Sequence, residues 1–94
     1  MSDDDDDPYK VFIKKKVLKS VLQMPERVQD KFWNLVADLK VQGPMPKGWK
    51  NLSKLTGNDY HCHLEYSWVA CWSYENGSFR IEVYYVGSRE GAPY

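Results

Sequence analysis

Three titratable side chains stand at alternate positions in one short segment of the sequence. His61, His63 and Glu65 are each separated by a single residue, and alternate side chains of a β-strand point to the same face, about 7 Å apart. Cleavage of RNA without a metal ion needs a base for the 2′-hydroxyl proton, an acid for the leaving oxygen and a cation for the phosphorane charge. Imidazole and carboxylate groups suit the first two roles. The trio is therefore a candidate site for acid–base chemistry at a phosphate.

Two other interpretations of this segment stay open. Alternating polar side chains are also what the exposed face of an ordinary surface strand carries. Zinc binding is the second alternative, because Cys62 and Cys71 occur near the histidines. Cys62, however, would point to the opposite face from both histidines, and the chain has no Cys-x-x-Cys pair. We therefore expect no metal ligand and no small-molecule cofactor.

Cationic side chains that could hold a phosphate occur in two parts of the sequence. Lys47, Lys50 and Lys54 lie just before the histidine segment, where they would contact phosphate or simply be the solvated end of a loop. Arg89 comes just after the last expected strand, a place where binding residues are often found. Arg80, at the start of that strand, is a further candidate for phosphate contact.

The chain ends on an aromatic residue, Tyr94. A phenol ring beyond the last strand can stack on an unpaired base, which is how proteins usually hold single-stranded RNA. A frayed terminus is the alternative, since the last residues of most domains are poorly ordered. We keep Tyr94 as a candidate site residue.

Length and composition indicate one small domain. A chain of 94 residues that is 43% hydrophobic and 15% aromatic has enough apolar surface for one packed core. No apolar run reaches the roughly 20 residues that cross a bilayer. The N-terminus is acidic where a secretory signal is basic and then apolar. We therefore expect a cytoplasmic protein with no membrane contact.

The formal net charge of zero conceals an uneven distribution. Five of the 13 acidic residues form the run Asp3 to Asp7, so that the rest of the chain has 13 basic against 8 acidic residues. Residues 1–8 are predicted to be a disordered acidic tail, because like charges repel and nothing in the run can be buried. Residues 9–94 are predicted to form the folded, basic domain, which suits a polyanionic partner.

The first half of the domain has the pattern of one strand and two helices. Residues 9–14 are rich in β-branched and aromatic types, which favours a strand. From about Lys15 the apolar residues recur at helical spacing until Met24-Pro25 interrupts them. A longer helix follows and ends at Gly43-Pro44. Its apolar stripe covers four turns and consists of Val28, Phe32, Leu35, Val36 and Leu39.

The second half of the domain has the pattern of an antiparallel sheet. Strands are expected over roughly residues 59–66, 68–75 and 79–87, with Asn76-Gly77 as a hairpin turn between the last two. The fold class is α+β: two N-terminal helices packed on one face of a mainly antiparallel sheet of about four strands, in the order β-α-α-β-β-β. In the first of these strands, alternate side chains point to opposite faces. Cys62, Leu64 and Tyr66 would therefore lie beneath the helices, and His61, His63 and Glu65 would lie on the other face.

Three motifs follow one another between residue 52 and the end of the chain. They are Leu52-x-x-Leu55-x-Gly57-x-x-Tyr60-His-x-His63, Trp68-Val-Ala-Cys-Trp72 and Tyr85-Val-Gly-Ser-Arg-Glu-Gly-Ala-Pro-Tyr94. Together with the element order over residues 9–94, they resemble the RelE/ParE superfamily of type II toxins, and most of all its RelE and HigB-like translational repressors.

The resemblance implies a ribosome-dependent endoribonuclease that cuts mRNA in the A site without a metal ion. A cognate antitoxin and mRNA on the ribosome would be its partners. By position, Arg89 would match the family's C-terminal arginine that stabilises the scissile phosphate, and Tyr94 its terminal tyrosine. Lys50 and Lys54 would match the charged group before the second strand.

The chain departs from the family pattern at two places. His61 and His63 stand where the family has Tyr-Arg-x-Arg or Tyr-Lys-x-Lys, and Trp68 stands where it often has a catalytic arginine. The resemblance therefore leaves the general base open among His61, His63 and Glu65. Two alternative functions also stay open: a ParE-like toxin that inhibits DNA gyrase without catalysis, and a degenerate member that only binds an antitoxin or RNA.

Overall fold

The structure, a computed structural model, describes residues 7–94. Its elements in chain order are β1 (Lys10–Ile13), α1 (Lys15–Leu22), α2 (Glu26–Gln42), β2 (Lys50–Lys54), β3 (Asp59–Glu65), β4 (Trp68–Tyr74) and β5 (Arg80–Ser88). The predicted acidic tail over residues 1–8 falls outside the described residues, apart from Asp7 and Pro8. Neither of the two helices in the described part of the chain is long and apolar enough to span a membrane.

The apolar stripe predicted over residues 28–39 forms the buried side of α2. Its five residues are all buried, because the helical period places them on one side. Gly43 ends the helix with φ of 91°, a conformation that glycine adopts without strain, and donates its N–H to the Leu39 carbonyl at 3.0 Å. A Cβ added at Gly43 would lie 2.8 Å from the Tyr9 ring, so a larger residue would push the helix end away from the start of the domain.

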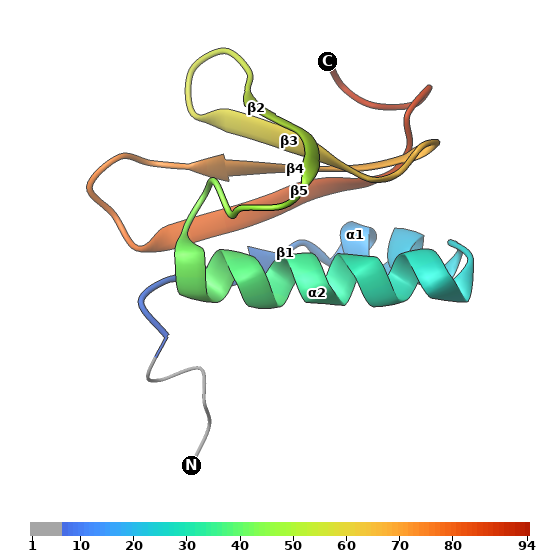
Figure 1. Ribbon diagram of the computed structural model, residues 1–94, viewed down its shortest axis with the longest axis horizontal. Helices are drawn as coiled ribbons and strands as arrows, with labels where there is room; N and C mark the ends of the chain where they lie inside the picture. Colours follow the sequence, from blue (N-terminus) through green and yellow to red (C-terminus); the bar gives the residue numbers. More distant parts are fainter. Residues whose placement is uncertain (1–6) are drawn as a thin grey trace.

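The five strands form one sheet in the order β1-β5-β4-β3-β2. β1 pairs with β5 in parallel, and the other three pairings are antiparallel. The turn between β4 and β5 contains Asn76-Gly77, with Gly77 at φ of 83°. The predicted α+β architecture is therefore confirmed, and Figure 1 shows both helices on one side of the sheet.

The sheet has one strand more than the expected number of about four. The extra strand is β2, which runs antiparallel to β3 at the sheet edge. Its residues are mostly exposed, and its register is interrupted between Lys50 and Ser53, where Asn51 has φ of 54°. A short, polar edge strand of this kind has no alternating apolar pattern by which sequence could identify it.

The main core lies between the helices and the facing side of the sheet. It is built from buried residues that include Phe32, Leu35 and Leu39 of α2, Cys62 and Leu64 of β3, Ala70 and Trp72 of β4, and Ile81 and Val83 of β5. The indole N–H of Trp72 donates to the Pro44 carbonyl at 3.0 Å, so the largest core side chain has no unsatisfied donor. Ala70 and Trp72 therefore identify the face of β4 that meets the helices.

The opposite face of β4 carries Val69 and Cys71, which are also fully buried but lie outside this main core. Burial raises the pKa of the Cys71 thiol to about 12, and that of Cys62 likewise to about 12. Both thiols are therefore protonated at neutral pH and pack as small apolar groups. The chain's own C-terminal region must cover part of this second face.

Candidate active site

Strand β3 presents its two histidines on the face that points away from the helices. Cys62 and Leu64, which alternate with them, are buried in the main core. His61 and His63 are only partly buried, and their ring centroids lie 6.1 Å apart. The alternation predicted for this strand is thus observed from Tyr60 to Leu64.

Glu65 does not join the histidines, and the prediction that it shares their face is wrong. The β3–β4 register shifts between His63 and Glu65, which breaks the strict alternation of a regular strand. The Glu65 carboxylate instead accepts hydrogen bonds from Nε of Arg27 at 3.1 and 3.2 Å and pairs with Lys31 at 3.2 Å. Hydrogen bonds from Arg27, and then from Lys31, hold the pKa of Glu65 below its usual value. Its role is to tie the end of β3 to α2.

The same register shift affects the next residue. Tyr66 was expected beneath the helices, but its side chain is 80% exposed. It lies in the turn after the shift, where the alternation of β3 no longer applies. The Arg89 guanidinium lies 5.3 Å from the centre of the Tyr66 ring.

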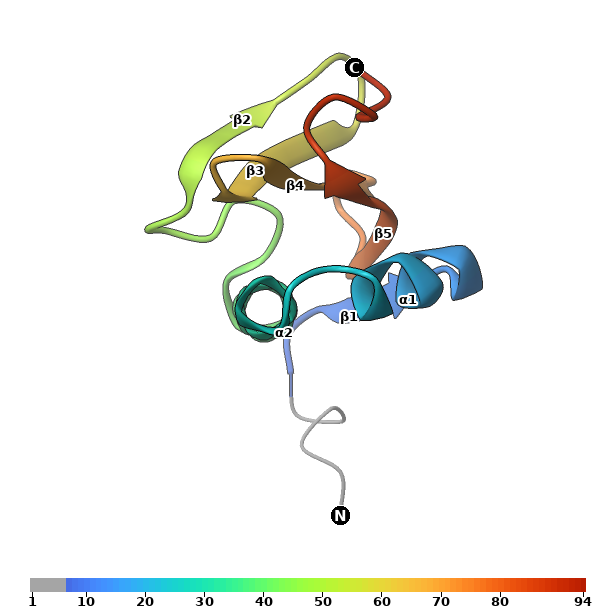
Figure 2. The same cartoon turned by 90° about the vertical axis from the view of Figure 1, so that its right-hand side faces the viewer.

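The C-terminal segment brings Arg89 and Tyr94 to the histidines. The Tyr94 ring centroid is 4.5 Å from that of His61, and the Arg89 backbone N–H donates to the Ser67 carbonyl at 2.8 Å. Figure 2 shows the end of the chain close to the loop after β2, on the side of the sheet away from both helices. An open hollow of about 610 Å³ results, lined by Asn51, Leu52, Ser53, His61, His63, Arg89 and Tyr94.

Tyr85 supports this C-terminal segment, although sequence analysis did not single it out. Its hydroxyl donates to the Ser88 carbonyl at 2.8 Å. A Cβ at Gly87 or at Gly91 would lie 2.9 or 3.0 Å from the same hydroxyl oxygen. Glycine at both positions therefore lets the segment fold closely over Tyr85 without displacing its hydroxyl. The two glycines flanking Arg89 were the signal in the sequence that could have indicated this close approach.

Ser53 is a second residue that sequence analysis missed. Its hydroxyl oxygen lies 3.2 Å from Nδ1 of His61, and it is the cross-strand partner of that histidine. Burial, followed by the nearby charge of His63, lowers the pKa of His61, whereas a hydrogen bond with the Ser53 backbone acts in the opposite direction. His61 is therefore mainly neutral at neutral pH, and in the tautomer whose Nδ1–H donates to the Ser53 hydroxyl oxygen, Nε2 is free to act as a base.

The pKa of the Tyr94 phenol is raised, whereas that of the His61 imidazole is lowered. Burial is the largest cause that raises the pKa of its phenol, and the Arg89 charge only partly offsets it. The phenol therefore stays protonated throughout the physiological pH range. The hollow thus combines a neutral imidazole, a guanidinium and a protonated phenol, a set that can accept a proton, hold an anion and stack on a base.

The other predicted cations lie outside this hollow. Lys50 is the cross-strand partner of His63, and Lys50 and Lys47 line a second cavity of about 570 Å³. The ammonium of Lys54 lies 5.8 Å from the Tyr60 ring centre, and the Arg80 guanidinium lies 3.8 Å from that of Phe12. Among residues 7–94, no three side chains of the His, Cys, Asp and Glu types cluster closely enough to hold a metal ion.

Several solved structures share the architecture that holds this hollow. A chain of the archaeal RelE–RelB complex from Pyrococcus horikoshii matches with a TM-score of 0.72 and 19% identity, covering 90% of this chain and 99% of that one. The E. coli toxin RelE, as a mutant in the free state, matches with a TM-score of 0.69 and 17% identity, covering 90% of this chain and 87% of that one. A chain of the E. coli DinJ–YafQ toxin–antitoxin complex matches with a TM-score of 0.64 and 17% identity, covering 88% of this chain and 94% of that one.

The fold is therefore the one that these RelE and DinJ–YafQ structures share with this chain, as the sequence motifs indicated. No protein-family model matches the sequence, and no curated protein does so either. At identities of 19% or less, the likeness to these structures establishes the fold. The activity has to be argued from the residues of this chain.

Proposed function

We propose that this protein is a cytoplasmic toxin that cleaves mRNA on the ribosome by metal-independent attack of a 2′-hydroxyl on the adjoining phosphate. The observation that carries the proposal is the meeting of His61, His63, Arg89 and Tyr94 around one open hollow. These groups come from β3 and from the chain's end, which lie 26 or more residues apart in the sequence. The toxin structures with this fold support the proposal at the level of architecture.

The roles follow from the surroundings of each group. His61 takes the 2′-hydroxyl proton through Nε2, in the tautomer whose Nδ1–H donates to the Ser53 hydroxyl oxygen. The 2′-oxygen then bonds to phosphorus while the bond from phosphorus to the 5′-oxygen breaks, leaving a 2′,3′-cyclic phosphate and a 5′-hydroxyl. His63, whose ring centroid is 6.1 Å from that of His61, protonates the leaving 5′-oxygen.

The remaining two groups bind rather than transfer protons. The Arg89 guanidinium holds the phosphate oxygens, whose charge grows in the transition state. The Tyr94 phenol stacks on the nucleobase beside the scissile phosphate. Lys54 and Arg80 have no part in this scheme, because both lie against aromatic rings outside the hollow.

A cognate antitoxin is the proposed protein partner. Two of the structures with this fold are complexes, one between RelE and RelB and one described as a toxin–antitoxin complex. A toxin that cleaves mRNA in its host's cytoplasm would need such an inhibitor. Co-expression with the neighbouring open reading frame is expected to abolish toxicity.

Induced expression in a bacterium, followed by mapping of mRNA 5′ ends, tests the proposal. New ends in a fixed phase with the codons are expected, and His61→Ala or Arg89→Ala should each reduce them by about 10²–10⁴-fold, the usual effect of losing one such group. Circular dichroism of both variants checks that the fold is intact. Growth arrest with intact mRNA and an SOS response would instead indicate a toxin that acts on DNA gyrase.

A further inference from the structure

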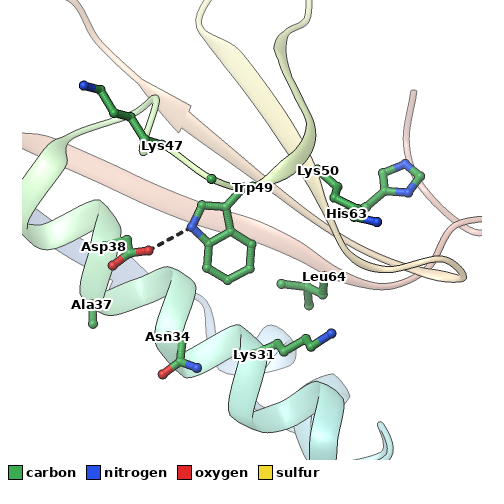
Figure 3. A pocket seen from close by; sticks show the side chains of 10 residues that line it. Lys31, Asn34, Ala37, Asp38, Lys47, Trp49, Lys50, His63 and Leu64 are labelled. Carbon is green, nitrogen blue, oxygen red and sulfur yellow. Dashed lines mark hydrogen bonds between the residues drawn. The ribbon is translucent and has the colours of Figure 1, made fainter.

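A second cavity adjoins the hollow that contains the histidines. It has a volume of about 570 Å³ and lies between α2 and the segment that leads into β2. Figure 3 shows the Trp49 ring at its centre, with Lys47 on one side and Lys50 and His63 on the other. His63 lines both this cavity and the hollow, so the two adjoin at that side chain and are together called the groove.

The cavity wall carries a net positive charge. Lys47 and Lys50 form no ion pair with any residue of the described range 7–94. The third lysine in the wall, Lys31, is paired with Glu65. Asp38 is the acidic residue of the wall, and its carboxylate accepts the indole N–H of Trp49 at 2.9 Å. The two unpaired ammonium groups therefore outnumber the one carboxylate of the wall, which favours an anion.

Trp49 is held in a fixed position inside this cationic cavity. Its indole N–H is bound by Asp38 on α2, and its ring is only partly buried. A ring fixed in this way presents a flat apolar surface at a low entropic cost. Aromatic rings beside cationic side chains are the usual means by which proteins bind single-stranded nucleic acid. Asn34, on the α2 wall, adds a side-chain amide that can hydrogen-bond to a base edge.

We propose that this cavity binds the nucleotide of single-stranded RNA that adjoins the one at the histidines. Lys50 holds its phosphate, Lys47 adds a positive charge on the other side of the ring, and Trp49 stacks on its base. Lys50 pairs across the sheet with His63, and cross-strand partners have Cβ atoms about 4.5–5.5 Å apart. An RNA strand with its scissile phosphate at the histidines therefore passes directly to Lys50. The inference rests on the proposed function, because it assumes that the hollow holds RNA.

Binding of short RNAs of two lengths tests the subsite. The probes are fluorescein-labelled 2′-O-methyl RNAs of randomised sequence, a dinucleotide and a tetranucleotide, whose methyl group blocks cleavage so that anisotropy reports binding alone. Lys47→Ala/Lys50→Ala should weaken tetranucleotide binding by tenfold or more and change dinucleotide binding by less than about twofold. In a plot of the logarithm of the tetranucleotide binding constant against the logarithm of the salt concentration, the slope should become shallower by about 0.7, because one phosphate contact is lost.

Two matched variants act as controls. Lys15→Ala/Lys19→Ala removes the same charge from exposed positions of α1, away from the groove, and should leave tetranucleotide binding unchanged. Lys47→Arg/Lys50→Arg retains the charge and should restore most of the affinity. If Lys47→Ala/Lys50→Ala leaves tetranucleotide binding as unchanged as Lys15→Ala/Lys19→Ala does, the subsite is rejected. The proposed function still stands in that case if Arg89→Ala weakens dinucleotide binding. If the parent protein binds neither RNA, the subsite is rejected, and the proposed function is then decided by the mapping of mRNA 5′ ends.

Discussion

The two imidazoles of the hollow differ in their surroundings, although they alternate on the same strand. His61 has the Tyr94 ring on one side and Ser53 at its Nδ1. His63 stands at the boundary between the two cavities, beside Lys50. The fold thus gives two identical side chains different environments, which is how active sites separate a base from an acid. Sequence spacing placed both groups on one face but could not distinguish them, because Ser53 comes from a strand that the sequence did not indicate.

His63→Gln tests the state of His61. The nearby charge of His63, after burial, lowers the pKa of His61, whereas a hydrogen bond with the Ser53 backbone raises it, so removal of the His63 charge should raise that pKa. NMR titration of the imidazole protons is expected to place the His61 midpoint below about 6.5, the ordinary value for histidine, in the parent protein, and higher in the variant. A His61 midpoint above 6.5 in the parent protein would contradict its assignment as the neutral base.

Glu65→Gln separates the structural role of Glu65 from the catalytic role first expected for it. Cleavage should stay within about twofold of the parent, whereas loss of a general base typically costs about 10²–10⁴-fold. Because the pKa of Glu65 is held low in the folded state, its ion pairs stabilise the fold above its ordinary pKa, and that contribution is lost as the pH falls through the lowered value. The melting temperature should therefore be reduced at neutral pH but not in acid. A large loss of cleavage would restore Glu65 as the base.

At the scale of elements, the C-terminal segment Ser88–Tyr94 determines whether the hollow is complete. It carries two of the four proposed functional groups, yet it has no regular secondary structure beyond Ser88. What holds it is local: the Tyr85 hydroxyl, the Ser88 carbonyl and the two glycines that allow their close approach. The Arg89 backbone bond to Ser67 adds an anchor on the β3–β4 turn.

A pair of substitutions at Tyr85 and Gly91 tests this anchoring. Gly91→Ala would place a Cβ 3.0 Å from the Tyr85 hydroxyl, displacing the segment and lowering kcat by about tenfold or more, as small misplacements of catalytic groups do. Tyr85→Phe removes that hydroxyl and one hydrogen bond, worth about 1 kcal/mol of stability. The double variant should recover activity relative to Gly91→Ala alone. If its effects simply add, steric contact with Tyr85 is not what positions the segment.

The elements themselves were predicted from sequence to different degrees. Both helices, the first strand and the last three strands follow from periodicity and from Pro and Gly positions. Strand β2 could not be predicted in this way, because an exposed edge strand with Asn51 in a left-handed conformation has no apolar alternation. The misplacement of Glu65 has a related cause: a single register shift at the end of β3 reverses the face of every residue beyond it.

At the scale of the whole molecule, the layers separate stability from function. The helices and the facing side of the sheet enclose the main core, which includes Trp72, Phe32 and Leu35. The other face is free to carry polar groups, and the hollow lies on it, whereas the adjoining cavity lies between α2 and the segment that leads into β2. The hollow can therefore be changed residue by residue without loss of the core. Which partner occupies it is a question of chemistry rather than of fold.

The most direct test is cleavage of a defined mRNA on purified ribosomes, with and without a 2′-deoxy substitution at the cleaved nucleotide. The proposed mechanism predicts fragments that end in a 2′,3′-cyclic phosphate and begin with a 5′-hydroxyl. It also predicts no cleavage of the 2′-deoxy mRNA and a loss of about 10²–10⁴-fold in His61→Ala. Cleavage of the 2′-deoxy mRNA at the parent rate, or fragments with 5′-phosphate ends, would contradict it.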